Sequence, residues 1–310
     1  MRVYILSRNE SLYSTRRLVE EATNKGWEVE VIDYLKCTIE IMKGELLINY
    51  KGKVLPTPDA IIPRIGASRT FYGTAMVRHF EMMDVFSTSG NLAIARSRDK
   101  LRSLQVLSRN DVDMPKTVFA SNESNAKDVI ALSGGAPLVL KILEGTQGVG
   151  VVLVDSEKAA KSVLDAFYGM DVNLLVQEFI AEANGTDIRA FVVDGEVVGA
   201  MKRKGAEGDF RSNLHQGGSA TAYKLNRKEK ATAIAAAKAM GLGVCGVDMI
   251  PSKRGPLVME VNSSPGLEGI EKSTNINIAL KIMDYIESNV KPKCPINPQK
   301  RKLKKDKIGA

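Results

Sequence analysis

The sequence has 310 residues, of which 44% are hydrophobic and 26% are charged, an ordinary composition for a globular protein with two or three domains. No apolar run approaches the length of a membrane span and the first ten residues do not read as a secretory signal, so we expect a cytoplasmic protein without membrane contact. Three scattered cysteines without a Cys-x-x-Cys pair argue against a zinc site or a disulfide framework, and only two histidines argue against catalysis by histidine pairs.

The net charge of +8 is concentrated at one end of the chain. Residues 291–310 contain eight Lys or Arg and one acid, which leaves the rest of the sequence close to neutral. Such a tail is typical of a solvated, disordered end. The alternative is an electrostatic contact with RNA or another acidic partner, which salt would weaken.

Residues 1–96 are predicted to form an open α/β domain. Strands and helices alternate along it, and this alternation predicts a parallel sheet. The expected strands lie at 3–6, 27–32 and 60–62, and the expected helices at 12–25 and 69–84. No glycine-rich dinucleotide fingerprint follows the first strand, so a Rossmann cofactor site is not expected.

Residues 97–175 are expected to form a second unit, residues 176–290 a third, and residues 291–310 the basic tail. In the second unit we predict helices at 100–108 and 123–132 and strands at 116–119, 138–143 and 151–154. In the third we predict strands at 174–179, 188–193 and 197–202, a helix at 228–240, a hairpin at 244–262 and a closing helix at 275–288. Asp194-Gly195 is a strong signal for a hairpin turn.

The segment 244–262 is the most informative, because two apolar, β-branched runs flank a turn-rich break and predict an antiparallel hairpin. Pairing about Arg254 places Asp248 opposite Glu260, and Asn262 shares the face of Glu260 because side chains alternate along a strand. Two carboxylates about 5 Å apart at Cβ repel each other unless a cation lies between them. Hard oxygen ligands favour Mg²⁺ or Mn²⁺. The alternative is a surface hairpin with incidental acids.

Other segments carry groups suited to a nucleotide. Three glycines in the loop 144–150 allow backbone amides to close on phosphate, although such a loop can also be a plain turn. Lys141, in an otherwise buried strand, either meets an anion or extends to water from a sheet edge. Glu178 and Phe179, between the second and third units, offer backbone groups to a nucleobase or simply end a core strand. The basic loop 202–213 either neutralises a triphosphate or is solvated.

In this order the residues resemble the ATP-grasp ligases. The resemblance rests on Lys100, Lys141, the loop 145–150, Glu178 and the motif Asp248…Glu260-x-Asn262-x-x-Pro265-Gly266, and it covers residues 97–290. Three runs look more narrowly like the RimK glutamate ligases: Pro63-Arg64-Ile65-Gly66, residues 211–218, and Asn262-Ser263-Ser264-Pro265-Gly266. The resemblance implies an α/β (α+β) ATP-grasp fold of three domains, the first being an N-terminal pre-ATP-grasp domain.

The resemblance also implies a two-step reaction. ATP phosphorylates an acceptor carboxylate, and the amine of free L-glutamate then attacks the acyl phosphate. The implied acceptor is the C-terminus of ribosomal small-subunit protein six, and poly-α-glutamate is a further implied product. The alternatives are a ligase for another small acceptor, such as a cofactor, peptide or amino-group carrier, and a nucleotide-binding regulator without turnover. An intact set of metal ligands argues against the regulator.

The family pattern assigns a role to each matching residue. Two Mg²⁺ or Mn²⁺ ions would be held by Asp248, Glu260 and Asn262. The nucleotide would be held by Lys100, Lys141, Gly148, Glu178, Phe179, Asp187, Arg211, Ser212 and Asn213. The transferring phosphoryl group and the tetrahedral intermediate would be stabilised by Arg203, Arg211 and Asn213.

The substrate pocket is the least defined part of the sequence. Arg64, with Ser68 nearby, is the candidate for holding an acidic substrate, because arginine binds carboxylate in a bidentate way; the alternative is a surface arginine beside a helix. The family resemblance also makes a homo-oligomer an expectation, and the basic tail is a candidate contact for ribosomal RNA.

Overall fold

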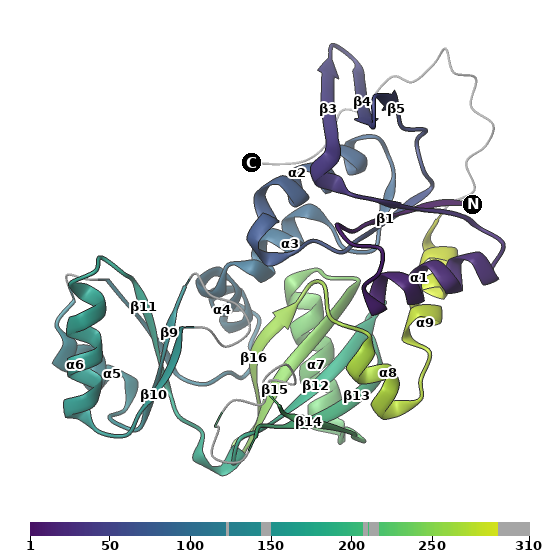
Figure 1. Cartoon of the computed structure of the whole chain (residues 1–310). Helices are drawn as coiled ribbons and strands as arrows, with labels where there is room; N and C mark the ends of the chain where they lie inside the picture. The colour runs from purple at the N-terminus through teal and green to yellow at the C-terminus, as the bar shows by residue number, and fades with distance from the viewer. Residues whose placement is uncertain (122–123, 144–149, 207–209, 211–216, 291–310) are drawn as a thin grey trace.

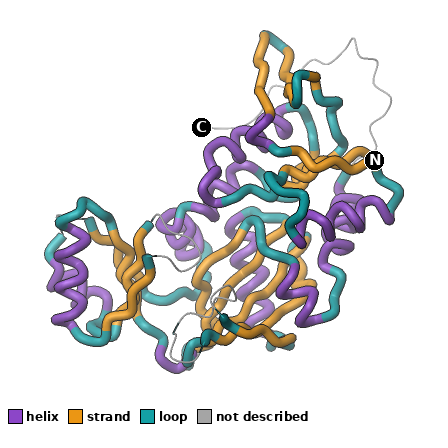
Figure 2. Tube along the Cα trace, in the orientation of Figure 1, coloured by secondary structure: helices purple, strands orange, loops and turns teal. Residues whose placement is uncertain are grey.

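The computed structural model describes residues 1–121, 124–143, 150–206, 210 and 217–290, and shows three bodies (Figures 1 and 2). The first body contains a parallel sheet in the order β2-β1-β6-β7, so the predicted parallel sheet is confirmed. Its strands are β1 (Arg2–Leu6), β2 (Glu28–Ile32), β6 (Ala60–Pro63) and β7 (Phe86–Ser87). Its helices are α1 (Tyr13–Asn24), α2 (Thr70–Met82) and α3 (Asn91–Arg98).

A small antiparallel sheet, which the sequence did not lead us to expect, extends from the same body (Figure 1). It contains β3 (Cys37–Met42), β4 (Glu45–Tyr50) and β5 (Lys53–Val54). The short helices η1 (Tyr34–Lys36) and η2 (Ala67–Arg69) precede β3 and α2. Tyr72 of α2 donates a hydrogen bond to the carbonyl of Cys37 over 2.6 Å, which fixes the base of this sheet.

The second body is a four-stranded antiparallel sheet in the order β10-β9-β11-β8, on which α5 and α6 pack (Figure 1). Its strands are β8 (Thr117–Ala120), β9 (Leu138–Ile142), β10 (Val151–Val154) and β11 (Leu174–Glu178), and its helices are α5 (Ala126–Ser133) and α6 (Glu157–Tyr168). The expected boundary between residues 175 and 176 falls inside β11. The chain leaves this sheet only after Glu178, because β11 pairs along its length with β9.

The third body is a five-stranded antiparallel sheet in the order β14-β13-β12-β15-β16. Its strands are β12 (Thr186–Val193), β13 (Glu196–Lys204), β14 (Ser219–Ala222), β15 (Val244–Ser252) and β16 (Gly255–Asn262). Its helices are α7 (Arg227–Met240), α8 (Glu268–Thr274) and α9 (Ile278–Asn289); the short helix η3 (Ala181–Ala183) precedes β12. Helix α4 (Lys100–Arg109) packs on α7 and β16, so it lies with this body although it precedes the second body in sequence.

The alternation of strand side chains divides the core of the third body. Ile188, Ala190 and Val192 pack in the cluster that includes α7. Phe191 and Val193 pack with α8 and α9, in a cluster that continues into β1 and α1 of the first body. The predicted turn at Asp194-Gly195 is confirmed, since both residues have the positive φ that a tight two-residue hairpin requires.

A buried polar network ties the first body to the end of the chain. Arg17 of α1 donates through Nε to Glu271 over 3.1 Å and through Nη2 to Asn277 over 3.0 Å and Glu21 over 2.9 Å. Figure 1 shows α1 lying directly against α8 and α9. The first body is therefore joined to the third by both an apolar cluster and an ion-pair network. Among the described residues, no helix is both long and apolar enough to cross a membrane.

Candidate active site

The hairpin β15–β16 brings the predicted metal ligands together. Asp248 pairs with Glu260, as predicted. The hairpin is not centred on Arg254 as expected, however, because Ser252 pairs with Gly255. The two-residue turn is Lys253-Arg254, which alone would set Asp248 opposite Met259. A bulge between Asp248 and Met249 shifts the register by one residue and restores the Asp248–Glu260 pair.

Asn262 links the two acids on the same sheet face. Its Nδ2 lies 2.9 Å from Glu260 Oε1 and 3.3 Å from Asp248 Oδ2, so all three side chains converge. The alternative of a surface hairpin with incidental acids does not fit Asp248, which is only 2% exposed, whereas Glu260 is exposed. Convergent carboxylate and amide oxygens suit Mg²⁺ or Mn²⁺. No cluster of three or more His, Cys, Asp or Glu residues able to hold a metal occurs among the described residues, and Asn262 is the third predicted ligand beside the two acids.

Two arginines keep Asp248 ionised. Arg189 on β12 is the cross-strand partner of Asp248, and it donates from Nε to Asp248 Oδ1 over 2.6 Å and from Nη2 to Oδ2. The guanidinium of Arg203 lies 3.0 Å from the same Oδ2. Burial alone would raise the pKa of Asp248, but these guanidinium groups lower it to about 2. Oδ1 accepts only one of these hydrogen bonds, so this oxygen keeps a lone pair for a cation.

Arg203 and Asp187 form the neighbouring pair on the same face. Arg203 donates through Nε to Asp187 Oδ1 over 2.7 Å and also through Nη2, and both side chains are almost fully buried. Asp187, expected on the ribose side, is thus engaged by Arg203 in this structure. Sequence reasoning missed Arg189, although its two-residue spacing from Asp187 on a predicted strand places both on one face.

Groups from three segments surround Glu260. Its side chain is exposed, but partial loss of hydration next to the protein, together with the charge of Asp248, raises the pKa of its carboxyl. Burial lowers the pKa of Arg98, Lys100 and Lys141, and the negative charge of Glu260 opposes that effect in each case. Both predicted phosphate-binding lysines therefore lie close enough to Glu260, a predicted metal ligand, for its charge to act on them.

The two lysines are held in place by polar groups. Lys100, the first residue of α4, donates to the carbonyl oxygens of Ile142 over 2.9 Å and Leu143 over 3.1 Å, at the end of β9. Lys141 donates to Gln177 Oε1 over 2.6 Å, and its pKa falls to about 8, mainly because of burial. The alternative of a lysine at a sheet edge is wrong, because β9 is paired on both sides by β10 and β11.

Glu178 ends β11, where the second body meets the third. Its Oε1 accepts from the backbone N–H of Lys116 over 2.6 Å and from Arg254 of the β15–β16 turn. Phe179 packs edge-on against Phe210, with ring centroids 6.4 Å apart. Because the carboxylate of Glu178 is already engaged, the backbone groups of Glu178 and Phe179 are the ones suited to reading a base.

The other candidates are placed as follows. Arg64 is half-buried directly after β6, and Ser68 is exposed in η2. Four predicted nucleotide-binding residues lie outside the described residues: Gly148, Arg211, Ser212 and Asn213.

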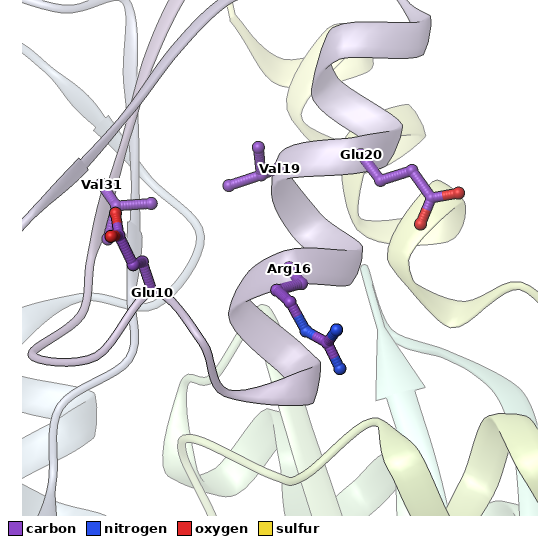
Figure 3. A pocket seen from close by; sticks show the side chains of 5 residues that line it. All are labelled: Glu10, Arg16, Val19, Glu20 and Val31. Carbon is purple, nitrogen blue, oxygen red and sulfur yellow. The ribbon is translucent and has the colours of Figure 1, made fainter.

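One surface hollow of about 510 Å³ lies in the first body (Figure 3). It is lined by Glu10, Arg16, Val19, Glu20 and Val31, from α1, the preceding loop and β2. None of these belongs to the convergent set around Glu260, and a shallow hollow with mixed charges does not resemble a phosphate site.

The architecture and the convergent acids, lysines and arginines define an ATP-grasp enzyme. Two family models match the chain: the RimK PreATP-grasp domain over residues 1–94 and the RimK-like ATP-grasp domain over residues 97–286. Among curated relatives, a protein of Saccharophagus degradans named probable alpha-L-glutamate ligase is 59% identical, covering 94% of this chain and 97% of that protein. One of Vibrio vulnificus with the same name is 60% identical, with the same coverage.

Solved structures share the fold. A RimK domain ATP-grasp protein from Sphaerobacter thermophilus aligns with a TM-score of 0.69 at 20% identity, covering 92% of this chain and 99% of that chain. The ATP-grasp ligase PsnB, complexed with minimal precursor, aligns with a TM-score of 0.73 at 19% identity, covering 94% of this chain and 98% of that chain. The chain belongs to the RimK-like ATP-grasp family, which confirms the predicted fold, and it is an ATP-dependent ligase.

Proposed function

We propose that this ligase joins L-glutamate through its amine to the C-terminal carboxylate of a protein, using ATP and two Mg²⁺ or Mn²⁺ ions. The observation that carries the proposal is the convergence on Glu260 of Asp248, Asn262, Lys100 and Lys141. The names of the curated relatives support L-glutamate as the amino acid that is joined.

The reaction is proposed to proceed in two steps. An oxygen of the acceptor carboxylate attacks the γ-phosphorus of ATP, and the bond from that phosphorus to the ADP oxygen breaks. The amine of L-glutamate then attacks the acyl carbon, the C–O bond to phosphate breaks, and the nitrogen gives up a proton as the amide forms. The tetrahedral intermediate carries an oxyanion, which preorganised cations stabilise.

The residues of the chain supply the charges for these steps. Asp248, Glu260 and Asn262 would hold the divalent ions, which when bound neutralise the charge of the phosphates. Lys100 and Lys141 would contact the phosphates. Arg203 is proposed to act at the reacting phosphoryl group.

The nucleotide is proposed to occupy the junction of the second and third bodies. The backbone at Glu178 and Phe179 would face adenine, and Asp187 the ribose. Gly148, Arg211, Ser212 and Asn213 complete the proposed contacts with the triphosphate and the intermediate.

The acceptor is proposed to be the C-terminus of ribosomal small-subunit protein six. The test incubates the protein with ATP, Mg²⁺ and L-glutamate, with and without that ribosomal protein, and follows ADP release and the mass of the acceptor. Mass increments of one glutamate residue are expected. If ADP is released only with a small acceptor, that acceptor and not the ribosomal protein is the substrate. If nucleotide binds but no ADP is released under any condition, the proposal that the chain is a catalyst is refuted.

A pair of variants tests the metal assignment. Glu260→Ala should abolish ADP release because it removes one of two convergent carboxylates, while thermal unfolding stays close to that of the wild type. Glu196→Ala, at an exposed glutamate on β13, should leave turnover unchanged. Retained turnover in Glu260→Ala would contradict the assignment.

The basic tail is proposed to contact ribosomal RNA. Deleting residues 291–310 removes eight Lys or Arg and one acid. The deletion should weaken association with ribosomes at low salt and spare turnover of small acceptors; unchanged association would refute the role. Self-association of the chain stays a prediction, which sedimentation equilibrium checks.

A further inference from the structure

A second cationic cluster lies at the carboxyl edge of the first sheet. Arg64 directly follows β6, and its backbone N–H donates to the carbonyl of Leu6, the last residue of the neighbouring strand β1, over 3.0 Å. In sheets of parallel strands, ligands bind beyond the carboxyl ends of the strands. The position of Arg64 is therefore that of a ligand-binding residue.

The guanidinium of Arg64 has no hydrogen bond or ion pair with any residue that the structure describes. Burial and the nearby charge of Arg98 lower its pKa to about 10, so Arg64 remains a cation at neutral pH. Two half-buried cations side by side repel each other, and an anion that lies against both relieves that repulsion. The pair therefore indicates a site for an anionic group of a ligand.

Arg98, at the end of α3, is held rigidly at the same place. Its Nη2 donates to the carbonyl of Ile65 over 2.6 Å, and its Nε donates to Ser263 Oγ over 3.3 Å. The backbone of Gly73 in α2 approaches Ile65 so closely that a Cβ at this position would lie 2.3 Å from Ile65 Cγ2. The first and third bodies thus meet at Arg98, next to the segment that follows the metal ligand Asn262.

The two arginines differ in their distance from the metal ligands. Arg98 contacts Ser263, which directly follows the metal ligand Asn262, whereas Arg64 follows β6 and has no such contact among the described residues, so Arg64 lies farther from the phosphate centre. Ser264, in the segment that Arg98 contacts, has a buried hydroxyl without a hydrogen-bond partner among the described residues. An amino donor bound here would extend from the metal ligands toward Arg64.

We propose that Arg64 and Arg98 together bind the side-chain carboxylate of the L-glutamate that enters as the amino donor. This inference rests on the proposed function. The amine of the donor must reach the acyl carbon near the metal ligands. The side-chain carboxylate of L-glutamate is farther from that amine than the α-carboxylate is, so it is the group that reaches the more remote cation, Arg64. A half-buried pair of guanidinium groups accepts a carboxylate and disfavours the neutral amide of glutamine.

Calorimetry on the full chain with Mg²⁺ and a non-hydrolysable ATP analogue tests the site. The probes are L-glutamate, L-glutamine and glutarate, a dicarboxylate without an amine. Arg64→Gln should weaken L-glutamate and glutarate by roughly 30-fold or more, as expected for truncating one partner of a desolvated charge pair. It should leave L-glutamine and the nucleotide analogue unchanged, whereas Arg64→Lys should retain part of the glutamate affinity.

The matched control is Arg69→Gln, which makes the same change at an exposed arginine in η2 and should alter none of the affinities. Equal weakening of L-glutamate and L-glutamine by Arg64→Gln would overturn the proposal, because it would show that Arg64 reads the α-carboxylate. Unchanged glutamate affinity, or no binding of glutarate by the wild type, would also overturn it. Glutarate binding that depends on Arg64, without any glutamate binding or turnover, would support the site and refute the proposed function.

Discussion

Arg189 is expected to be a main source of stability at the active site, because it keeps a nearly fully buried carboxylate ionised. Arg189→Met removes both of its hydrogen bonds to Asp248 and leaves Arg203 and Asn262 as partners. The pKa of Asp248 falls from an ordinary 3.8 to about 2 in the folded protein. A difference of about 2 pH units corresponds to about 2–3 kcal/mol of folding stability.

The direction of the pH dependence follows from the lowered pKa. The contribution of Asp248 is fully present above about pH 4 and is lost as the pH falls toward 2, because the unfolded state then binds the proton first. Urea unfolding at neutral pH should show a loss of about 2–3 kcal/mol in Arg189→Met. The decrease in stability between about pH 4 and 2 should also be smaller in the variant, since the pKa of Asp248 is no longer held as low.

The matched control is Lys202→Met, at an exposed position on the adjacent strand β13. Its unfolding free energy should stay within about 0.5 kcal/mol of the wild type. If Arg189→Met were equally mild, or if wild-type stability were flat between about pH 4 and 2, the electrostatic role given to Arg189 would be refuted.

Three further predictions concern neighbouring groups. ATP affinity, measured by calorimetry, should fall as the pH rises past about 8, because the Lys141 ammonium has a pKa lowered to about 8 and only the charged form attracts phosphate; Lys141→Arg should flatten this profile, and an identical slope would contradict the assignment. Gly73→Ala should lower the free energy of unfolding by about 1–3 kcal/mol, because the new Cβ would lie 2.3 Å from Ile65 Cγ2. The control is Gly66→Ala, because the nearest atom to a Cβ at that position is 3.9 Å away. Arg254→Ala should cost less than about 1 kcal/mol, because both it and Glu178 are partly exposed; a larger loss in urea unfolding would show that this pair fastens the second body to the third.

The sequence was most informative where local rules determine side-chain placement. The facing of Asp248 and Glu260 follows from strand alternation and a turn, and it is correct. The register that produces this pair differs from the expected one. The turn length and the bulge each shift the register by one residue, and the two shifts cancel. A bulge at Met259 has no local signature in a run of apolar residues, so the sequence alone could not reveal it.

Two omissions differ in kind. The sheet at residues 37–54 carries a readable signal, since alternating runs flank Lys43-Gly44 and Gly44 adopts the positive φ of a tight turn. Arg98 carries no such signal. Its importance comes from contacts with Ile65 and Ser263, which lie far away in sequence and meet only in the folded chain.

The Arg17 network has a consequence for how the enzyme admits its nucleotide. Because Arg17 fastens α1 to Glu271 and Asn277, the beginning and the end of the described chain form a single rigid frame. The chain passes between this frame and the antiparallel sheet of β8–β11 twice, after α4 and after Glu178. We therefore expect domain motion during turnover to consist of the second body rotating as a unit against this frame.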